Sequence, residues 1–142
     1  DWIVGFAGAV IADGRGREAW RGALDDRDIA AIKACLPDAR SVRHEEAVVQ
    51  ISTTSEAPVV PLGYRTESYQ GITFVSRWAC SKLRGVRRLL RQLGWLGRVR
   101  AFGDGVYDDE LLTFFDGARV QGGRASPSSF ARMVTEVGDV DL

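Results

Sequence analysis

The chain has 142 residues and a mass of 15.6 kDa, the length of one average domain. Its 45% hydrophobic and 27% charged residues are ordinary globular values and exclude a disordered tail, a collagen-like repeat or a coiled coil. Because 19 basic residues balance 19 acidic ones, we expect no nucleic-acid partner and no membrane partner. The apolar runs are too short for a membrane span, and Cys35 and Cys80 form no CxxC pattern, so the sequence favours a cytoplasmic protein.

The first part of the chain predicts a hairpin followed by a helix. Residues 2–6 and 9–11 are short apolar runs that favour strands. The glycine-rich turn at residues 13–16 should return residues 17–20 as an antiparallel strand. A helix should then start with Asp25 or Asp26 as its cap.

The middle of the chain predicts two further strands. Pro37 should end the first helix, because proline cannot donate to the helix ladder. Residues 47–51 and 72–75 are apolar runs typical of strands, and residues 52–61 are polar and turn-rich, which indicates a loop.

The last part of the chain alternates helix and strand. A helix should begin at Lys82 and end near Gly94, because glycine is suited to a left-handed C-cap. A strand at residues 98–102, a helix at 108–115, a strand at 118–121 and a helix at 126–134 should follow. This order predicts an α/β fold with a parallel sheet. We expect the first, hairpin-rich part of the chain to form a separate α+β module at residues 1–77. The α/β part then comprises residues 78–142.

The helix that begins at Lys82 has leucines on one face and arginines on the other. The arginines are Arg84, Arg87, Arg88 and Arg91. Such runs are typical of solvated helix surfaces, and we expect that rather than a binding patch. The tryptophans Trp20, Trp78 and Trp95 are expected in core or hinge packing.

Candidate site residues gather where the strand at residues 98–102 ends. Asp104 and Asp108 lie four positions apart around a glycine-rich turn, at a strand end where open parallel sheets bind ligands. Carboxylates in this place suit Mg²⁺, although a turn followed by a helix cap explains them as well. Lys82 at a helix N-terminus suits a phosphate oxygen, and an ordinary surface lysine is the alternative.

Two segments together resemble a known family. Residues 81–94, with Lys82 twelve positions before Gly94, and residues 99–108, which end in Gly-Asp-Gly-Val-Tyr-Asp, resemble the third and fourth motifs of haloacid dehalogenase-like phosphatases. The resemblance is greatest to the Cof-type sugar-phosphatase branch. Residues 1–36 resemble the start of that family's α/β cap, and residues 43–70 resemble the family least.

The resemblance implies a Mg²⁺-dependent phosphatase with the C-terminal half of a Rossmannoid parallel core and an α+β cap. An aspartate attacks the phosphorus of a small phosphorylated metabolite, such as a sugar phosphate, and water hydrolyses the aspartyl-phosphate. Lys82 would neutralise phosphoryl oxygens, and Asp104 would hold the metal. Asp108 would be a second residue of the metal site and would also act in catalysis. Gly8 and Tyr107 would contact the substrate.

The chain departs from the family pattern at several positions. Ala7 and Tyr107 stand where the family has asparagine, and Leu83 stands where it usually has glycine. The Asp-x-Asp-Gly-Thr motif of the nucleophile should precede the cap. Because the chain begins at Asp1 rather than methionine, we expect that motif upstream and expect this piece alone to be inactive.

Other interpretations stay open at this point. Asp13 with residues 51–53 could be a decayed nucleophile motif of a capless phosphatase, although Arg15 then replaces the general acid. A non-catalytic relic that binds a phosphorylated ligand or a protein, and a phosphomutase, are the rival functions. A partial core would also expose a sheet edge, which favours a homodimer.

Overall fold

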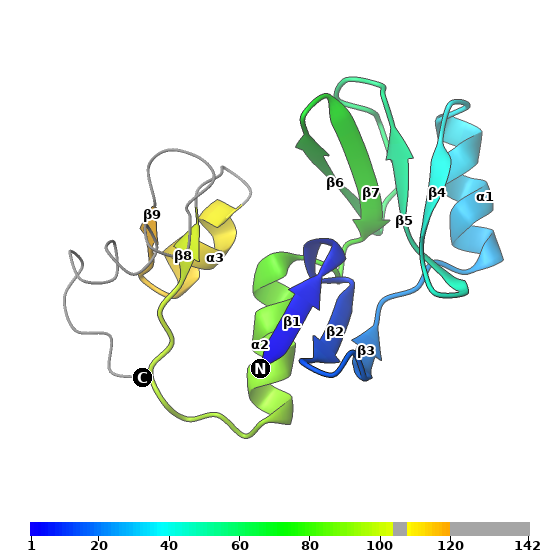
Figure 1. Ribbon diagram of the computed structural model, residues 1–142. Coiled ribbons are helices and arrows are strands. Elements are labelled where there is room, and N and C mark those ends of the chain that lie inside the picture. Colours follow the sequence, from blue (N-terminus) through cyan, green and yellow to red (C-terminus); the bar gives the residue numbers. More distant parts are fainter. Residues whose placement is uncertain (104–107, 120–142) are drawn as a thin grey trace. The chain divides into compact units, whose positions relative to one another are not determined.

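A computed structural model describes residues 1–103 and 108–119 (Figure 1). Contacts divide the chain into two compact units, Asp1–Leu96 and Gly97–Leu142, which are described separately below. The division into modules at residues 77 and 78 stays a prediction. Within the described residues, the helices are all too short or too polar to cross a bilayer.

The first unit begins with the predicted hairpin. Strands β1 (Trp2–Gly5), β2 (Val10–Asp13) and β3 (Glu18–Arg21) form an antiparallel sheet in that order. The short 3-10 helix η1 (Phe6–Gly8) joins β1 to β2. The hairpin expected from the turn at residues 13–16 is therefore confirmed.

The carboxylate of Asp13 holds this turn closed. It accepts hydrogen bonds from the backbone amides of Arg15 and Arg17, each at 2.9 Å, and from Arg17 Nε at 2.8 Å. These bonds, the Arg17 amide first, hold the pKa of Asp13 below its usual value. The structure thus shows that Asp13 forms this turn. The interpretation of Asp13 as part of a capless phosphatase's nucleophile motif does not assign it this role.

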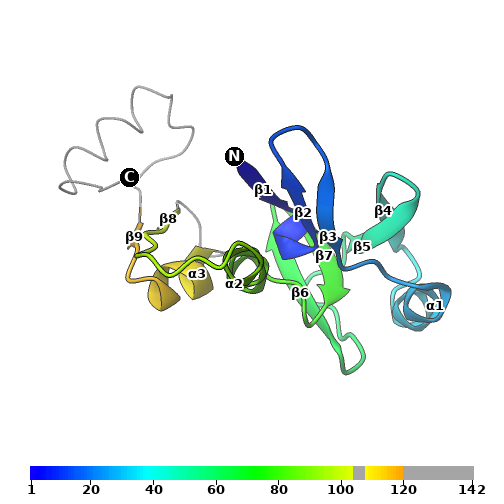
Figure 2. The same cartoon turned by 90° about the horizontal axis from the view of Figure 1, so that it is seen from below.

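Helix α1 (Asp26–Cys35) starts and stops where the sequence predicts. Asp25 is its N-cap, and Asp25 and Asp28 exchange hydrogen bonds with each other's backbone amides in a capping box. Its apolar face covers one side of a sheet (Figure 2). The buried core between them consists of Leu24, Ile32, Leu36, Val48, Ile51 and Val75.

That second sheet has four antiparallel strands in the order β4-β5-β7-β6. They are β4 (Arg40–His44), β5 (Ala47–Thr53), β6 (Tyr64–Tyr69) and β7 (Ile72–Arg77). The central strands β5 and β7 were predicted, but the edge strands β4 and β6 were not. The loop prediction is wrong for residues 52 and 53, which belong to β5.

Helix α2 (Lys82–Gln92) also matches its predicted ends. Ser81 is the N-cap, and its hydroxyl accepts from the amide of Arg84 at 3.1 Å. Gly94 has a φ of 61°, the left-handed conformation expected after the helix. The helix packs against η1 and β1 within the first unit (Figure 1).

The described part of the second unit contains one strand–helix–strand element. β8 (Phe102–Gly103) and β9 (Ala118–Arg119) pair in parallel, with α3 (Asp109–Phe114) between them in sequence. The strand predicted at residues 98–102 was too long, because only Phe102 of that range is in β8. Parallel pairing is confined to these two strands among the described residues, and the larger sheets are antiparallel. The helix predicted at residues 126–134 lies outside the described residues.

Candidate functional site

Two glycines bring η1 into direct contact with the first turn of α2. Gly8 has a φ of +88°, and a Cβ placed on it would overlap the carbonyl oxygen of Ser81 and lie 3.1 Å from the amide nitrogen of Lys82. A Cβ on Gly85 would lie 3.0 Å from the Cα of Gly8 and 2.6 Å from Cγ1 of Val4. Only residues without side chains allow so close an approach of loop and helix.

This contact places two of the predicted site residues together. Gly8 lies against the backbone of Ser81 and Lys82 at the amino end of α2. The cap there is the neutral Ser81, and the first turn carries no acidic residue. The amides and dipole of a helix N-terminus favour negative charge. Gly8 and Lys82 therefore lie where an anion would be stabilised.

The loop before Gly8 has a backbone that suits the residue the family carries there. Phe6 and Ala7 have φ values of 49° and 50°, which lie in the left-handed region. Asparagine tolerates this conformation, whereas it costs alanine about 1 kcal/mol. The turn is closed by a bond from the Ala9 amide to the Phe6 carbonyl at 3.0 Å. The conformation typical of asparagine is thus present although the residue at position 7 is alanine.

Asp108 lies at the carboxyl end of β8 in the second unit. It is only 8% exposed and precedes α3, without a side-chain capping bond to that helix. A Cβ on Gly103 would overlap the Asp108 side chain and lie 2.6 Å from its Oδ2. The glycine at the end of β8 therefore makes room for this carboxylate.

The chemistry of Asp108 fits one ligand of a magnesium ion. Magnesium takes one or two protein carboxylates beside water and substrate phosphate, and Asp108 supplies one such group at a strand end. Among residues 1–103 and 108–119, no group of three or more His, Cys, Asp or Glu side chains is arranged to hold a metal. Asp104 and Tyr107, the other predicted residues of this turn, lie outside the described residues.

The predicted site residues thus fall into two groups. Gly8 and Lys82 meet in the first unit, and Asp108 belongs to the second. Because each unit is described by itself, the convergence of Lys82 with the aspartates stays a prediction.

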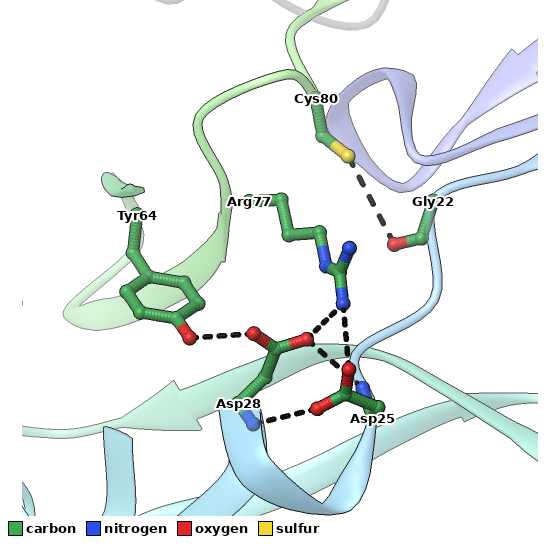
Figure 3. A network of polar contacts seen from close by, with 6 residues as sticks. All are labelled: Gly22, Asp25, Asp28, Tyr64, Arg77 and Cys80. Atoms are coloured by element: carbon green, nitrogen blue, oxygen red, sulfur yellow. Dashed lines mark hydrogen bonds and ion pairs between the residues drawn. The ribbon is translucent and has the colours of Figure 1, made fainter. Parts of the chain in front are cut away.

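A polar network at the amino end of α1 escaped the sequence analysis (Figure 3). Arg77, at the end of β7, pairs with Asp28 and with Asp25, the latter at 3.2 Å. The hydroxyl of Tyr64 donates to Asp28 at 2.6 Å. Burial alone raises the pKa of Asp28, but bonds from Tyr64, the Asp25 amide and Arg77 outweigh it and hold that pKa below its usual value. This network joins α1 to β6 and β7.

Cys80 lies beside this network, close to Gly22 (Figure 3). The side chain is 1% exposed, and burial raises the pKa of its thiol. A protonated, enclosed thiol of this kind is a packing group rather than a nucleophile.

A second cluster surrounds Asp38, directly after Pro37. Its carboxylate accepts from the Thr53 hydroxyl at 2.7 and 2.8 Å and from the amide and hydroxyl of Thr54, each at 3.0 Å. The Thr53 bond, followed by the Thr54 amide, lowers the pKa of Asp38 to about 2. No local pattern signals this cluster, because its members come from segments fifteen or more residues apart.

Comparison with solved structures identifies the fold. A haloacid dehalogenase-like hydrolase from B. subtilis aligns with a TM-score of 0.61 and 15% identity, over 83% of this chain and 68% of that one. A second match, with a TM-score of 0.65 and 15% identity, covers 92% of this chain and 67% of the other. That protein belongs to a study of crystal structures that show a conserved trigonal-bipyramidal intermediate in a phosphoryl-transfer superfamily.

The fold is therefore similar to that of haloacid dehalogenase-like hydrolases. At 15% identity the similarity concerns the fold alone. No family model matches the sequence, and no curated protein matches it either.

Proposed function

We propose that this chain is part of a cytoplasmic, magnesium-dependent phosphatase of the Cof type, which hydrolyses a small phosphorylated metabolite such as a sugar phosphate. The observation that carries the proposal is the contact of Gly8 with the amino end of α2 at Lys82, in a chain whose fold is similar to haloacid dehalogenase-like hydrolases. In this proposal residues 78–142 are the C-terminal part of a parallel core, and the parallel pair of β8 and β9 belongs to its sheet.

The amino end of α2 would bind the phosphoryl group. The Lys82 ammonium and the amides of the first helical turn would neutralise charge that grows on phosphoryl oxygens in the transition state. The glycine at position 8 keeps side chains out of this place, since any Cβ there would overlap Ser81. Tyr107 would contact the substrate from the turn before α3.

Asp104 and Asp108 would hold the magnesium ion. Bound there, the ion would supply further charge neutralisation for the phosphoryl group. Asp108 would also orient the Lys82 ammonium or a water molecule. Phosphoryl transfer depends mainly on positioning and charge neutralisation, so these side chains would supply an essential but incomplete part of the site.

The nucleophile would lie outside this chain. An aspartate there would attack phosphorus and release the alcohol, and water would then cleave the aspartyl-phosphate. A second aspartate outside the chain would protonate the leaving alcohol and activate the water. The 142-residue chain by itself would therefore be inactive.

The test uses the polypeptide encoded by the complete reading frame. Phosphate release from a panel of sugar phosphates is measured with magnesium present, for the wild type, Lys82→Ala and Asp104→Ala. Each substitution should lower kcat/KM by about 10²- to 10³-fold. Lys33→Ala and Asp26→Ala are matched controls, because both residues are exposed on α1, and they should leave the activity unchanged. Activity that survives Lys82→Ala and Asp104→Ala would refute the proposal.

A second candidate is a non-catalytic relic that binds a phosphorylated ligand or a protein partner. Tyr107 favours it, because the asparagine typical of the family is missing there. The coding sequence upstream of Asp1 separates the two, since an Asp-x-Asp-Gly-Thr motif in it supports the enzyme. A phosphomutase shares the aspartyl-phosphate chemistry, and product analysis with a sugar-phosphate substrate distinguishes it from a hydrolase.

A further inference from the structure

The arginine face of α2, expected from the sequence to be a solvated surface, lines an open cavity. The cavity has a volume of about 270 Å³. Its lining consists of Ala79, Arg84, Arg87, Arg88 and Arg91. All these residues belong to the first unit, and neither Gly8 nor Lys82 is among them.

Two of the guanidinium groups are fixed by tryptophan rings. Cζ of Arg88 lies 3.7 Å from the centroid of the Trp20 ring, and Cζ of Arg84 lies 5.1 Å from that of Trp78. Arg84 also donates to the carbonyl oxygen of Trp78 at 2.5 Å. Ring faces and a carbonyl oxygen orient a guanidinium but do not cancel its charge. These contacts therefore leave the positive charge in place.

The surroundings of the cavity favour an incoming anion. Helix α2 contains five basic residues and no acidic one between Lys82 and Gln92, and arginine stays charged at every accessible pH. The Nη1 atom of Arg88 is buried and has no hydrogen-bond partner within the described part of the chain. A guanidinium in this condition gains most from a ligand that brings several acceptor oxygens.

We propose that this cavity binds a polyphosphate group, that is, two or more linked phosphates on one small ligand. The lining arginines carry charge opposite to that of such a group, and their planar forks suit phosphate oxygens. A cavity needs about 10–15 Å³ of such volume to hold one water molecule, so about 270 Å³ leaves room for linked phosphates. The inference does not depend on the proposed phosphatase activity.

The test is a titration of the 142-residue chain with inorganic tripolyphosphate, without magnesium and at low salt. Heat of binding gives the affinity, and Trp20 and Trp78 report it independently through their fluorescence, because both rings contact arginines of the cavity. We expect saturable binding at one site, at least tenfold tighter than binding of orthophosphate. Absence of saturable binding, or equal affinity for orthophosphate, would overturn the proposal.

Arginine variants show whether the cavity is the binding site. Arg88→Gln and Arg91→Gln should each weaken tripolyphosphate binding at least tenfold. Arg91 is exposed, so its substitution tests the site even if loss of the Trp20 contact in Arg88→Gln disturbs folding. Arg27→Gln, an exposed arginine on α1, makes the same charge change and should alter the affinity less than twofold. Equal weakening by Arg27→Gln would indicate non-specific attraction and refute the site.

A nucleoside triphosphate identifies the source of the phosphates. Affinity equal to that of tripolyphosphate would support recognition of the phosphate chain alone. Affinity at least tenfold higher would support the cavity as a nucleotide site, with the base or sugar adding contacts. A nucleoside triphosphate that fails to compete with tripolyphosphate would contradict the proposal that linked phosphates on any small ligand suffice.

Discussion

The amino ends of α1 and α2 differ in the charge of the side chains that meet their backbone amides. Both helices present unpaired amides at this end. In α1 they meet the carboxylates of Asp25 and Asp28, and these in turn pair with Arg77. In α2 the cap is Ser81, and the glycine loop at Gly8 lies against it. The first end carries carboxylates in its own cap and first turn, whereas the second has a serine cap and no acidic residue in its first turn.

This difference separates a structural helix end from one suited to chemistry. Carboxylates that close the end of α1 also join it to β6 and β7, so their contribution is stability. The absence of an acidic residue from the first turn of α2 gives up a favourable interaction with the helix dipole. An anion is favoured at such a helix end, which is consistent with the proposed phosphoryl site.

The largest expected effect comes from filling the space at Gly8. Gly8→Ala should destabilise the chain by about 4 kcal/mol or more, because the new Cβ would overlap the Ser81 carbonyl and separate η1 from α2. Gly16→Ala is the matched control, since Gly16 also has a positive φ, of 79°, but no atom within 4 Å of the added Cβ. It should cost about 1 kcal/mol. Urea unfolding followed by circular dichroism measures both, and equal losses would mean that the close contact is unimportant.

A smaller effect is expected at the neutralised end of α1. Arg77→Met removes the partner of Asp25 and Asp28 and should cost about 1–3 kcal/mol, a range reduced because Arg77 is 40% exposed and its charge is screened. The control is Arg17→Met, which breaks the 2.8 Å pair with Asp13 at a site where Arg17 is 75% exposed. Its loss should be distinctly smaller in the same urea experiment. If the two variants are equally stable, the network at α1 contributes no more than a surface ion pair.

Local chemistry explains which elements could be predicted. The turn at Asp13, the cap at Asp25 and the left-handed Gly94 all act within a few residues of their own position. The edge strands β4 and β6 were missed, because edge strands carry polar residues toward solvent and lack an apolar run. Their existence depends on pairing with β5 and β7, which the sequence does not display.

The site was predictable only in part, for a related reason. The helix start suggested Lys82 and resemblance to a family suggested Gly8, and the structure places Gly8 against the backbone of Lys82. The arginine face was interpreted as solvated, because helical spacing shows which residues share a face but not what lies opposite. Trp20 comes from β3 and Trp78 from the segment after β7, so only the folded chain reveals the cavity they help to order.

The smallest expected effect concerns Asp38, a carboxylate held by hydroxyl and amide donors instead of an arginine. Its pKa of about 2 lies below the ordinary 3.8, so the folded state binds a proton more weakly than the unfolded state. The stability that Asp38 provides is therefore complete above pH 3.8 and is lost as the pH falls toward 2. Asp38→Asn should lower stability at neutral pH, and its difference from the wild type should shrink across this acidic window.

Urea unfolding at several pH values checks this expectation, with Glu56→Gln as the control on the loop that follows β5. Glu56 is exposed, so its substitution should leave the pH profile parallel to that of the wild type. A constant difference between Asp38→Asn and the wild type down to pH 2 would show that the carboxylate is not held by Thr53 and Thr54. A shrinking difference would instead show that hydroxyl and amide donors alone stabilise the carboxylate of Asp38, which follows α1. At the amino end of α1, the carboxylate of Asp28 has Arg77 and Tyr64 as partners.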